Sequence, residues 1–139
     1  MKLFRIDGSL IIDNPEIDNM KELVEYCVRE GISLQYADMQ GADMQGANMR
    51  YADMRSADMQ GANMRGAKMQ HAYMLGANMR GANMRGADMR DAKMQHANMQ
   101  GADMKGADMR SANMRYANMQ GANMRNADFC YADLRNADF

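Results

Sequence analysis

Apolar residues recur with a five-residue period through most of this chain. Ala occupies every fifth position from Ala37 to Ala137, and a large apolar residue follows two positions after each Ala. An α-helix turns about 100° per residue, so this period would spread the apolar side chains around its axis. A flat strand would place successive large residues on opposite faces. The pattern therefore predicts a chain that bends once per unit and points Ala and the large residue inward.

A second period is superimposed on the first at the last residue of each unit. Glycine pairs return every 20 residues, as Gly41 with Gly46 and Gly61 with Gly66. This spacing predicts a coil of four sides, of which residues 32–139 would make about five. Glycine supplies the positive φ that a type II turn needs at its second central residue. We therefore expect type II turns after two sides and a different turn after the other two.

The array reads Ala-(Asp/Asn)-Met-(Gln/Arg)-x, with a degenerate first copy at residues 32–36. It resembles the pentapeptide-repeat family over residues 32–139. The resemblance implies an all-β solenoid, the right-handed quadrilateral β-helix of that family. The chain differs from the family at the central residue, where Leu or Phe is usual and 18 of the 22 positions here are Met. Thioethers can bind soft metals, but these positions point inward, so core packing is the favoured role.

Residues 1–31 differ in kind and form a predicted N-terminal cap on the β-helix of residues 32–139. Asn14 followed by Pro15 is a helix-start signal and Gly31 is a stop signal, which predicts a helix over about 15–30. Its apolar residues share one face, which favours a lid on the first coil over a partner-binding helix. Upstream, the apolar residues around Asp7-Gly8 fit either a hairpin or one extended strand.

Composition narrows the class of protein. The 139 residues carry 17 basic and 18 acidic side chains, for a net charge of −1, and the small acidic excess lies in residues 1–31. The two cysteines, Cys27 and Cys130, are far apart and lack metal-ligand spacing, so we expect no disulfide framework, metal or cofactor. No signal peptide or transmembrane stretch is visible, which favours a cytoplasmic protein without a membrane partner.

Three groups of residues are candidates for contacts with other molecules. A basic column on one side could attract an anion, an acidic protein or nucleic acid, although a solvated face is the simpler interpretation. An irregular patch breaks the repeat on two adjoining sides and could recognise a partner, although a local duplication also explains it. The apolar residues of the final coil could pair two copies of the chain, unless the chain is truncated. The basic column is Arg65, Arg85, Lys105 and Arg125; the patch is His71, Tyr73, Leu75, Asp91, Lys93 and His96; the final-coil residues are Phe129, Leu134 and Phe139.

The sequence shows no nucleophile–base pairing and no carboxylate pair in a cleft, so we expect no enzyme. The favoured function is a non-enzymatic binding or scaffold protein that presents a rigid rod to a macromolecular partner. The family resemblance also implies an alternative, because some members bind DNA gyrase or topoisomerase IV by mimicking duplex DNA. That mimicry needs an acidic rod, whereas residues 32–139 carry a small basic excess. A second alternative is a module that binds anions or nucleic acid through the basic column.

Overall fold

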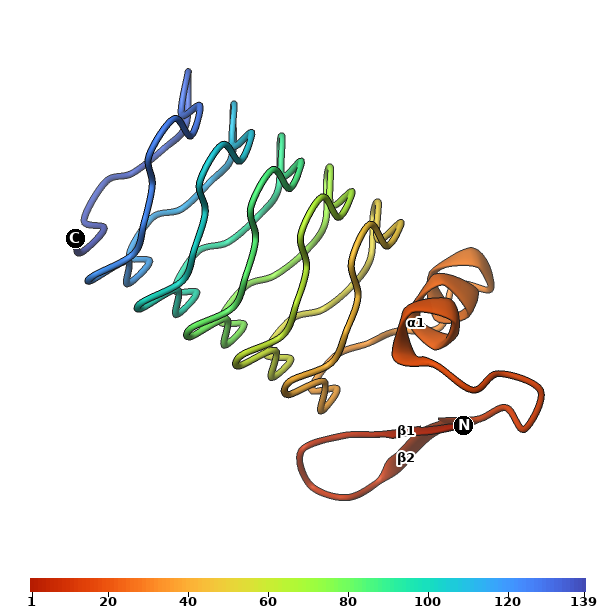
Figure 1. Ribbon diagram of the computed structural model, residues 1–139. Helices are drawn as coiled ribbons and strands as arrows, with labels where there is room; N and C mark the ends of the chain where they lie inside the picture. Colours follow the sequence, from red (N-terminus) through yellow and green to blue (C-terminus); the bar gives the residue numbers. More distant parts are fainter.

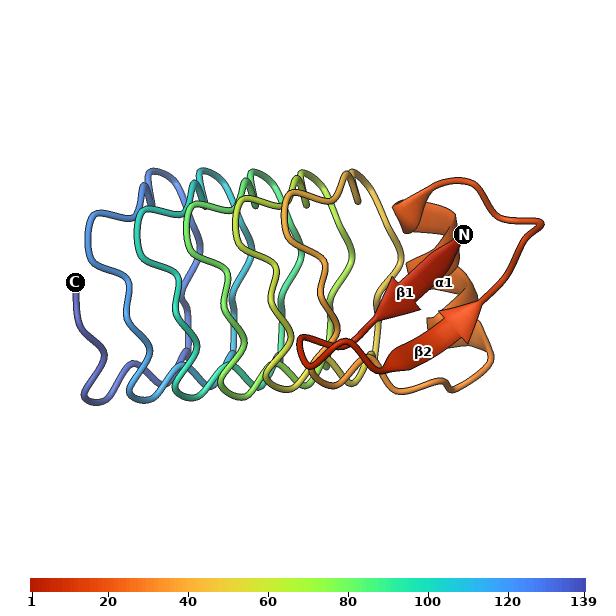
Figure 2. The same cartoon turned by 90° about the horizontal axis from the view of Figure 1, so that it is seen from below.

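The computed structural model describes all residues from Met1 to Phe139. The repeats wind into a rod of stacked coils, with an antiparallel hairpin and one helix gathered at its N-terminal end (Figures 1 and 2). The hairpin consists of β1 (Lys2–Phe4) and β2 (Leu10–Asp13), and the helix α1 spans Met20–Arg29. Of the two alternatives for the first residues, the hairpin is the one observed. The ten-residue α1 is the chain's one helix, and it lacks the length to cross a membrane.

Each unit pairs in parallel with the unit 20 residues later, from Asp38 with Asp58 to Asn118 with Asp138. The Met39 amide donates to the Asp58 carbonyl at 2.8 Å, and the Asp58 amide donates back to the Ala37 carbonyl at 2.9 Å. The same bonds repeat along the rod. They satisfy backbone groups that would otherwise lie unpaired beside an apolar interior.

Four faces follow from this pairing, and each recurs every 20 residues. Face 1 begins at Ala37, face 2 at Ala42, face 3 at Ala47 and face 4 at Ala52. A corner is named here after the face that precedes it. Because equivalent residues of a face stack along the rod, a position in the unit defines a column of side chains.

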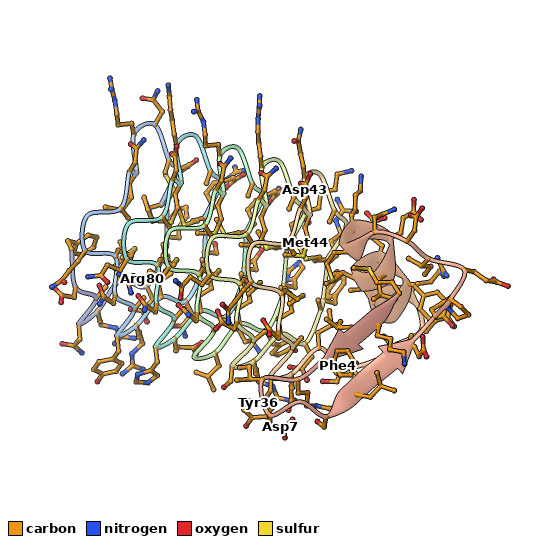
Figure 3. The ribbon with its side chains drawn as sticks, turned by 60° about the horizontal axis from the view of Figure 1, so that its bottom comes forward. Phe4, Asp7, Tyr36, Asp43, Met44 and Arg80 are labelled. Carbon is orange, nitrogen blue, oxygen red and sulfur yellow. The ribbon has the colours of Figure 1, made fainter.

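The interior is a column of Ala and Met. From Ala47 to Met119 every Ala and every central Met is buried, as the five-residue pattern predicted. Met44 is fully buried while its neighbour Asp43 is exposed on the outside of the coil wall (Figure 3). Ala lets the walls approach closely, and the unbranched Met fills the space between them. Alternation of inward and outward residues therefore positions every functional side chain on the surface.

All four corners use the same turn, contrary to the expectation of two turn types. Gly41 after face 1 has a φ of 62°, and Tyr51 after face 3 has a φ of 61°. In both turns the following Ala amide donates to the Met carbonyl three residues earlier, at 3.2 Å. Tyr and Ser thus adopt the left-handed conformation, as do glycine and the Asn, Asp and His residues that tolerate it.

The helix begins later than the sequence predicted. Asn14 forms a turn instead, since its carbonyl accepts from the Ile17 amide at 3.3 Å and its side chain accepts from the Glu16 amide at 3.1 Å. Asn19 is the N-cap, and its side chain accepts from the Glu22 amide at 2.9 Å. Asn19 with Glu22 follows the capping-box spacing, so the second Asn of the segment starts α1.

Candidate partner-binding faces

Outward-pointing aromatic residues of the repeats lie only on face 4 and on its two corners. Faces 1 and 2 carry Gly, Asp, Asn and long polar side chains at the equivalent positions. Tyr51 is 67% exposed, Tyr73 41% and Tyr116 48%. The residues of this set are Tyr36, Tyr51, His71, Tyr73, His96, Tyr116 and Tyr131. The rod is therefore chemically one-sided.

Neighbouring coils bring these rings into contact. Tyr51 and His71 stack with ring centroids 5.0 Å apart and planes 7° from parallel. His96 and Tyr116 stack at 5.0 Å and 4° on the opposite corner of face 4. The spacing matches the distance between adjacent coils, so the coil itself sets the stacking.

The predicted patch is partly brought together by the structure. Tyr73 lies one coil from Lys93, whose ammonium group is 4.5 Å from the ring centroid. Asp91 is one coil from His71, but they form no ion pair, and His71 instead stacks on Tyr51. Leu75 is exposed beside them.

The predicted patch lacks four of these seven aromatic residues, and two of the four form the stacks. Tyr51 and Tyr116 were left out of the predicted patch because they obey the five-residue rule and break no consensus. Both stand 20 residues from a predicted member, Tyr51 before His71 and Tyr116 after His96. The 20-residue period applied to aromatic residues alone would have found both stacks.

The basic column lies on face 2 and is exposed at all four predicted residues. Arg85 is 3.9 Å from Asp103, and the other three make no ion pair. The neighbouring column of face 2 consists of Asp and Asn residues that bond to one another. Asn63 donates to Asp43 at 2.9 Å and Asn123 donates to Asp103 at 3.1 Å. Face 2 therefore presents three free cations along a polar strip.

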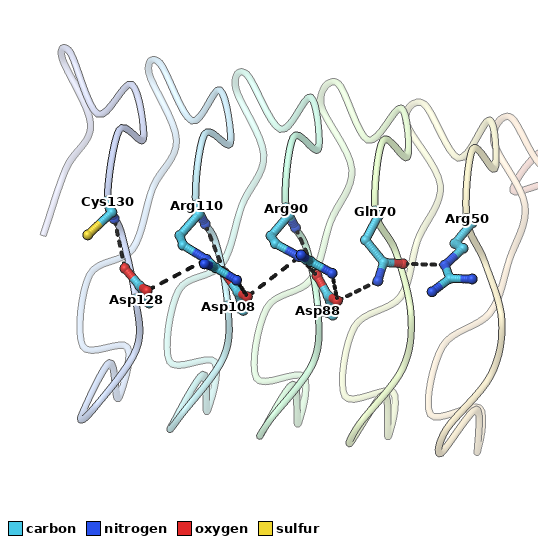
Figure 4. A network of polar contacts seen from close by, with 8 residues as sticks. All are labelled: Arg50, Gln70, Asp88, Arg90, Asp108, Arg110, Asp128 and Cys130. Atoms are coloured by element: carbon cyan, nitrogen blue, oxygen red, sulfur yellow. Dashed lines mark hydrogen bonds and ion pairs between the residues drawn. The ribbon is translucent and has the colours of Figure 1, made fainter.

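Face 3 carries a continuous polar ladder that the sequence did not reveal (Figure 4). Arg110 contacts Asp108 at 2.6 Å on its own coil and reaches Asp128 on the next coil at 3.7 Å. Arg90 contacts Asp88 at 2.8 Å and Asp108 at 3.5 Å in the same way. In the earlier coils Gln70 accepts from Arg50 at 2.8 Å and donates to Asp88. The ladder pairs charge with charge and leaves little for a partner to bind.

The ladder shifts the acidity of its members. Hydrogen bonds from Arg90 and Arg110 hold the pKa of Asp88 and of Asp108 below its ordinary value. At the end of the ladder, a hydrogen bond with Asp128 and its charge raise the pKa of the Cys130 thiol. Cys130 is exposed, but the raised pKa keeps it in the less reactive thiol form.

The residues predicted to form a dimer end lie on the last coil. Phe129 and Leu134 are half-buried, and Phe139 is 61% exposed. Pairing of two copies through this coil stays a prediction.

The hollows on the surface are shallow. One lies at the corner after face 3 and is lined by Arg50, Tyr51, Gln70, His71, Arg90 and Asp91. It adjoins the Tyr51–His71 stack, where a partner's side chain could rest against both rings. The arrangement as a whole suits contact with an extended surface.

Comparison with known protein families matches the chain to pentapeptide repeats, in eight copies over overlapping segments from residue 30 to residue 139. A pentapeptide repeat protein from Nostoc PCC 7120, alr5209, is 30% identical, with 76% of this chain and 89% of that chain covered and a TM-score of 0.57. Rfr23 from the cyanobacterium Cyanothece 51142 is 16% identical, with 85% and 98% covered and a TM-score of 0.44. Full-length QnrB1, a plasmid-mediated fluoroquinolone resistance protein, is 20% identical, with 73% and 67% covered and a TM-score of 0.39.

Comparison with curated proteins gives no match. The family match nevertheless extends over residues 30–139 and coincides with the coils of the rod. The chain belongs to the pentapeptide-repeat family.

Proposed function

We propose that this protein is a non-enzymatic binding scaffold that presents face 4 and its two corners to a protein partner. The observation that carries the proposal is the confinement of the outward aromatic residues to this one side of the rod. Aromatic side chains are enriched at protein interfaces because they bury a large area at little cost in conformational entropy. A rod with a closed core and fixed columns holds them in place before binding.

Photo-crosslinking from matched positions tests this proposal. Leu75 on face 4 and Arg80 on face 1 both follow a central Met in consecutive units, and both are exposed (Figure 3 labels Arg80). A photoreactive phenylalanine analogue at Leu75 should give a discrete crosslinked product in cells. The same group at Arg80 should give none. Equal crosslinking from both positions, or none from Leu75, would remove face 4 as the interface.

We propose further that residues 1–31 form a cap on the β-helix of residues 32–139. The buried face of α1, formed by Leu23, Val24 and Cys27, supports this role. The hairpin joins the first coil through the Asp38 amide, which donates to the Phe4 carbonyl at 2.9 Å, and Figure 3 shows Phe4 near Tyr36 at this end. A cap of this kind would shield the first coil from water and from pairing with another edge. A cytoplasmic location and pairing through the C-terminal coil remain predictions.

The charge distribution bears on the two alternative functions. A DNA mimic that binds gyrase needs an acidic strip, whereas face 3 alternates Asp with Arg and face 2 carries the basic column. We therefore favour the scaffold function over gyrase binding. A gyrase supercoiling assay with the purified protein tests the gyrase alternative. Nucleic-acid binding through face 2 is supported by the cations there that make no ion pair. It predicts an affinity that falls steeply with salt concentration and with the double substitution Arg65→Glu and Lys105→Glu.

A further inference from the structure

Five of the seven outward aromatic residues form a diagonal band across face 4, and Tyr36 and Tyr131 lie outside it. Tyr51 stacks on His71 at the corner after face 3, and Tyr73 stands two residues further on face 4. Lys93 lies against the Tyr73 ring one coil later, and His96, three residues on, stacks on Tyr116 at the corner after face 4. The aromatic band, defined as Tyr51, His71, Tyr73, Lys93, His96 and Tyr116, thus crosses the whole face. It advances three coil steps, or about 14 Å along the rod.

The backbone under the band is unlike that of the other faces. Every corner residue has a positive φ, which costs a side-chain-bearing residue roughly 1–2 kcal/mol more than glycine. The corners after faces 1 and 2 use glycine except at Asn126, whereas six of the eleven corners beside face 4 place Tyr or His there, at φ values of 58° to 61°. Such residues in the left-handed region gather at functional sites. The bulky rings at these corners therefore point to a role outside the core.

The free charge at the centre of the band is positive. Lys93 makes no ion pair and rests on the Tyr73 ring. The Arg115 guanidinium lies 5.5 Å from the Tyr116 ring and also has no carboxylate partner, because Asp133 is taken by Arg135 at 2.7 Å.

Two buried polar atoms beside the band have no hydrogen-bond partner. They are the Nε of Arg115 and the Oε1 of Gln95, one coil apart on face 4. Because the Nε of Arg115 is shielded from solvent, a partner's carboxylate would accept from the outer nitrogens of the Arg115 guanidinium, which also form no ion pair.

Three acidic side chains surround the band: Asp91 lies at the corner, and Asp53 and Asp133 lie on face 4. Arg55 neutralises Asp53 at 2.8 Å and Arg135 neutralises Asp133 at 2.7 Å.

We propose that the aromatic band binds a short acidic segment of the partner protein, in which carboxylates alternate with aromatic or aliphatic side chains. This inference rests on the proposed scaffold function and names the chemistry of its partner. The segment's apolar side chains pack against the exposed edges of the two stacks. Its carboxylates accept hydrogen bonds from Arg115 and from Lys93, which already lies over a ring and needs no further ordering.

Tryptophan-bearing peptides provide the probe, because the chain has no Trp and the fluorescence then reports only the peptide. A synthetic peptide of alternating Glu and Leu with one central Trp is titrated with the full-length protein, and its fluorescence anisotropy is measured. The same peptide with Lys in place of Glu is the charge control. The acidic peptide should bind and the basic peptide should not. Equal binding of both, or binding of neither, would overturn the proposal.

Two charge-matched variants place the binding on the rod. The double substitution Lys93→Glu and Arg115→Glu reverses the charge of Lys93 in the band and of Arg115 beside it. The double substitution Arg65→Glu and Lys105→Glu makes the same change on face 2. The band variant should weaken the acidic peptide at least about tenfold, as expected for loss of charge-assisted hydrogen bonds, and the face 2 variant should weaken it less than about twofold through screened charge alone. An equal loss of affinity in the two variants would mean that the peptide is attracted to any cation of the rod, and the band would not be its binding site.

Substitutions to glycine remove the rings without disturbing the corner. His71→Gly and Tyr116→Gly give these corners the residue that face 1 uses, so circular dichroism should show an intact coil. Both should weaken the acidic peptide, whereas Ser111→Gly, on the corner after face 3 but outside the band, should not. If the three variants bind alike, the rings are not the contact.

Further outcomes separate this inference from the function beneath it. If the acidic peptide does not bind but Leu75 still gives a crosslinked product, face 4 remains an interface and the inference of an acidic partner is wrong. If the peptide does not bind and Leu75 gives no crosslinked product, the scaffold proposal is wrong as well. An oligothymidylate that binds the band more tightly than the acidic peptide at equal salt would replace the acidic segment by a single-stranded nucleic acid.

Discussion

Faces 3 and 4 lie side by side on the rod and are built from the same five-residue unit over the same Ala and Met column. On face 3, Arg90 and Arg110 each contact aspartates of two coils. Face 4 has such pairs only at its two ends, where Arg55 contacts Asp53 and Arg135 contacts Asp133. Between them, Lys93 and Arg115 contact aromatic rings and no carboxylate. The unit fixes the backbone on both, so the difference comes from the residues placed one coil apart. Where opposite charges alternate along a column, each charged group already has a partner within the rod. Where the cations lie against aromatic rings, they remain available to a carboxylate of another protein.

The largest expected effect tests what the two faces share. Ala87→Leu on face 3 and Ala92→Leu on face 4 both force a branched side chain into the packed interior, where Ala87 and Ala92 are buried. Each should lower the free energy of unfolding by about 1–3 kcal/mol, because overpacking displaces neighbouring side chains. Thermal melts followed by circular dichroism measure the loss. A large loss at one Ala and none at the other would show that the faces differ inside as well as outside.

The interior was predictable from the sequence because, in a coil with one bend per unit, the five-residue period alone determines which side chains are buried. Inward Ala and Met follow from the five-residue rule alone, and the fold from the 20-residue rule. The start of α1 was not predictable in this way, since Asn14 and Asn19 both suit a cap and tertiary contacts decide between them. The turn at Tyr51 was mispredicted because intrinsic preference gave way to the stacking of coils.

The surface was predictable only where it broke the repeat. His71 and Lys93 stood out as irregular, but their contacts depend on residues a coil away that look ordinary in sequence. The face 3 ladder depends on rotamers of Arg90 and Arg110 that reach both coils, which composition does not specify. Columns of equivalent residues, read 20 apart, are therefore the right unit for predicting sites on such a rod.

A smaller effect is expected when the face 3 ladder is broken. Asp108 contacts Arg110 at 2.6 Å and Arg90 at 3.5 Å, whereas Asp91 at the corner makes no ion pair. Asp108→Asn should lower the melting temperature in low salt more than the matched change Asp91→Asn. High salt should shrink the difference, because exposed pairs are screened. Equal melting temperatures in low salt would show that the ladder does not stabilise face 3.

Acid should act on the ion pairs of both faces but at different places along the rod. Bonds from Arg90 and Arg110 lower the pKa of Asp88 and Asp108 at the middle of face 3, and a bond from Arg55 lowers the pKa of Asp53 to about 2 at the start of face 4. A lowered folded-state pKa gives stability that is present above the unfolded-state pKa, about 4, and is lost as the pH falls through the folded value.

The melting temperature should therefore be level from neutral pH down to about pH 4 and fall between about pH 4 and pH 2. The double substitution Asp88→Asn and Asp108→Asn should flatten this fall, and Asp91→Asn should leave it unchanged. A fall already complete at pH 5 would assign the acid transition to other groups.

The smallest expected effect on stability is at the corners of face 4, and it sharpens the contrast with the ladder. Tyr51→Gly relieves a left-handed tyrosine, at a φ of 61°, which favours folding by roughly 1–2 kcal/mol. It also removes the stack on His71, of about 0.5–1.5 kcal/mol, and adds freedom to the unfolded chain worth about 0.5–1 kcal/mol. These contributions nearly cancel, so the melting temperature should change little while binding of the acidic peptide falls. A marked destabilisation would show that the Tyr51 ring stabilises the coil. The aromatic residues of face 4 would then serve the fold, as the ion pairs of face 3 do, and not a partner.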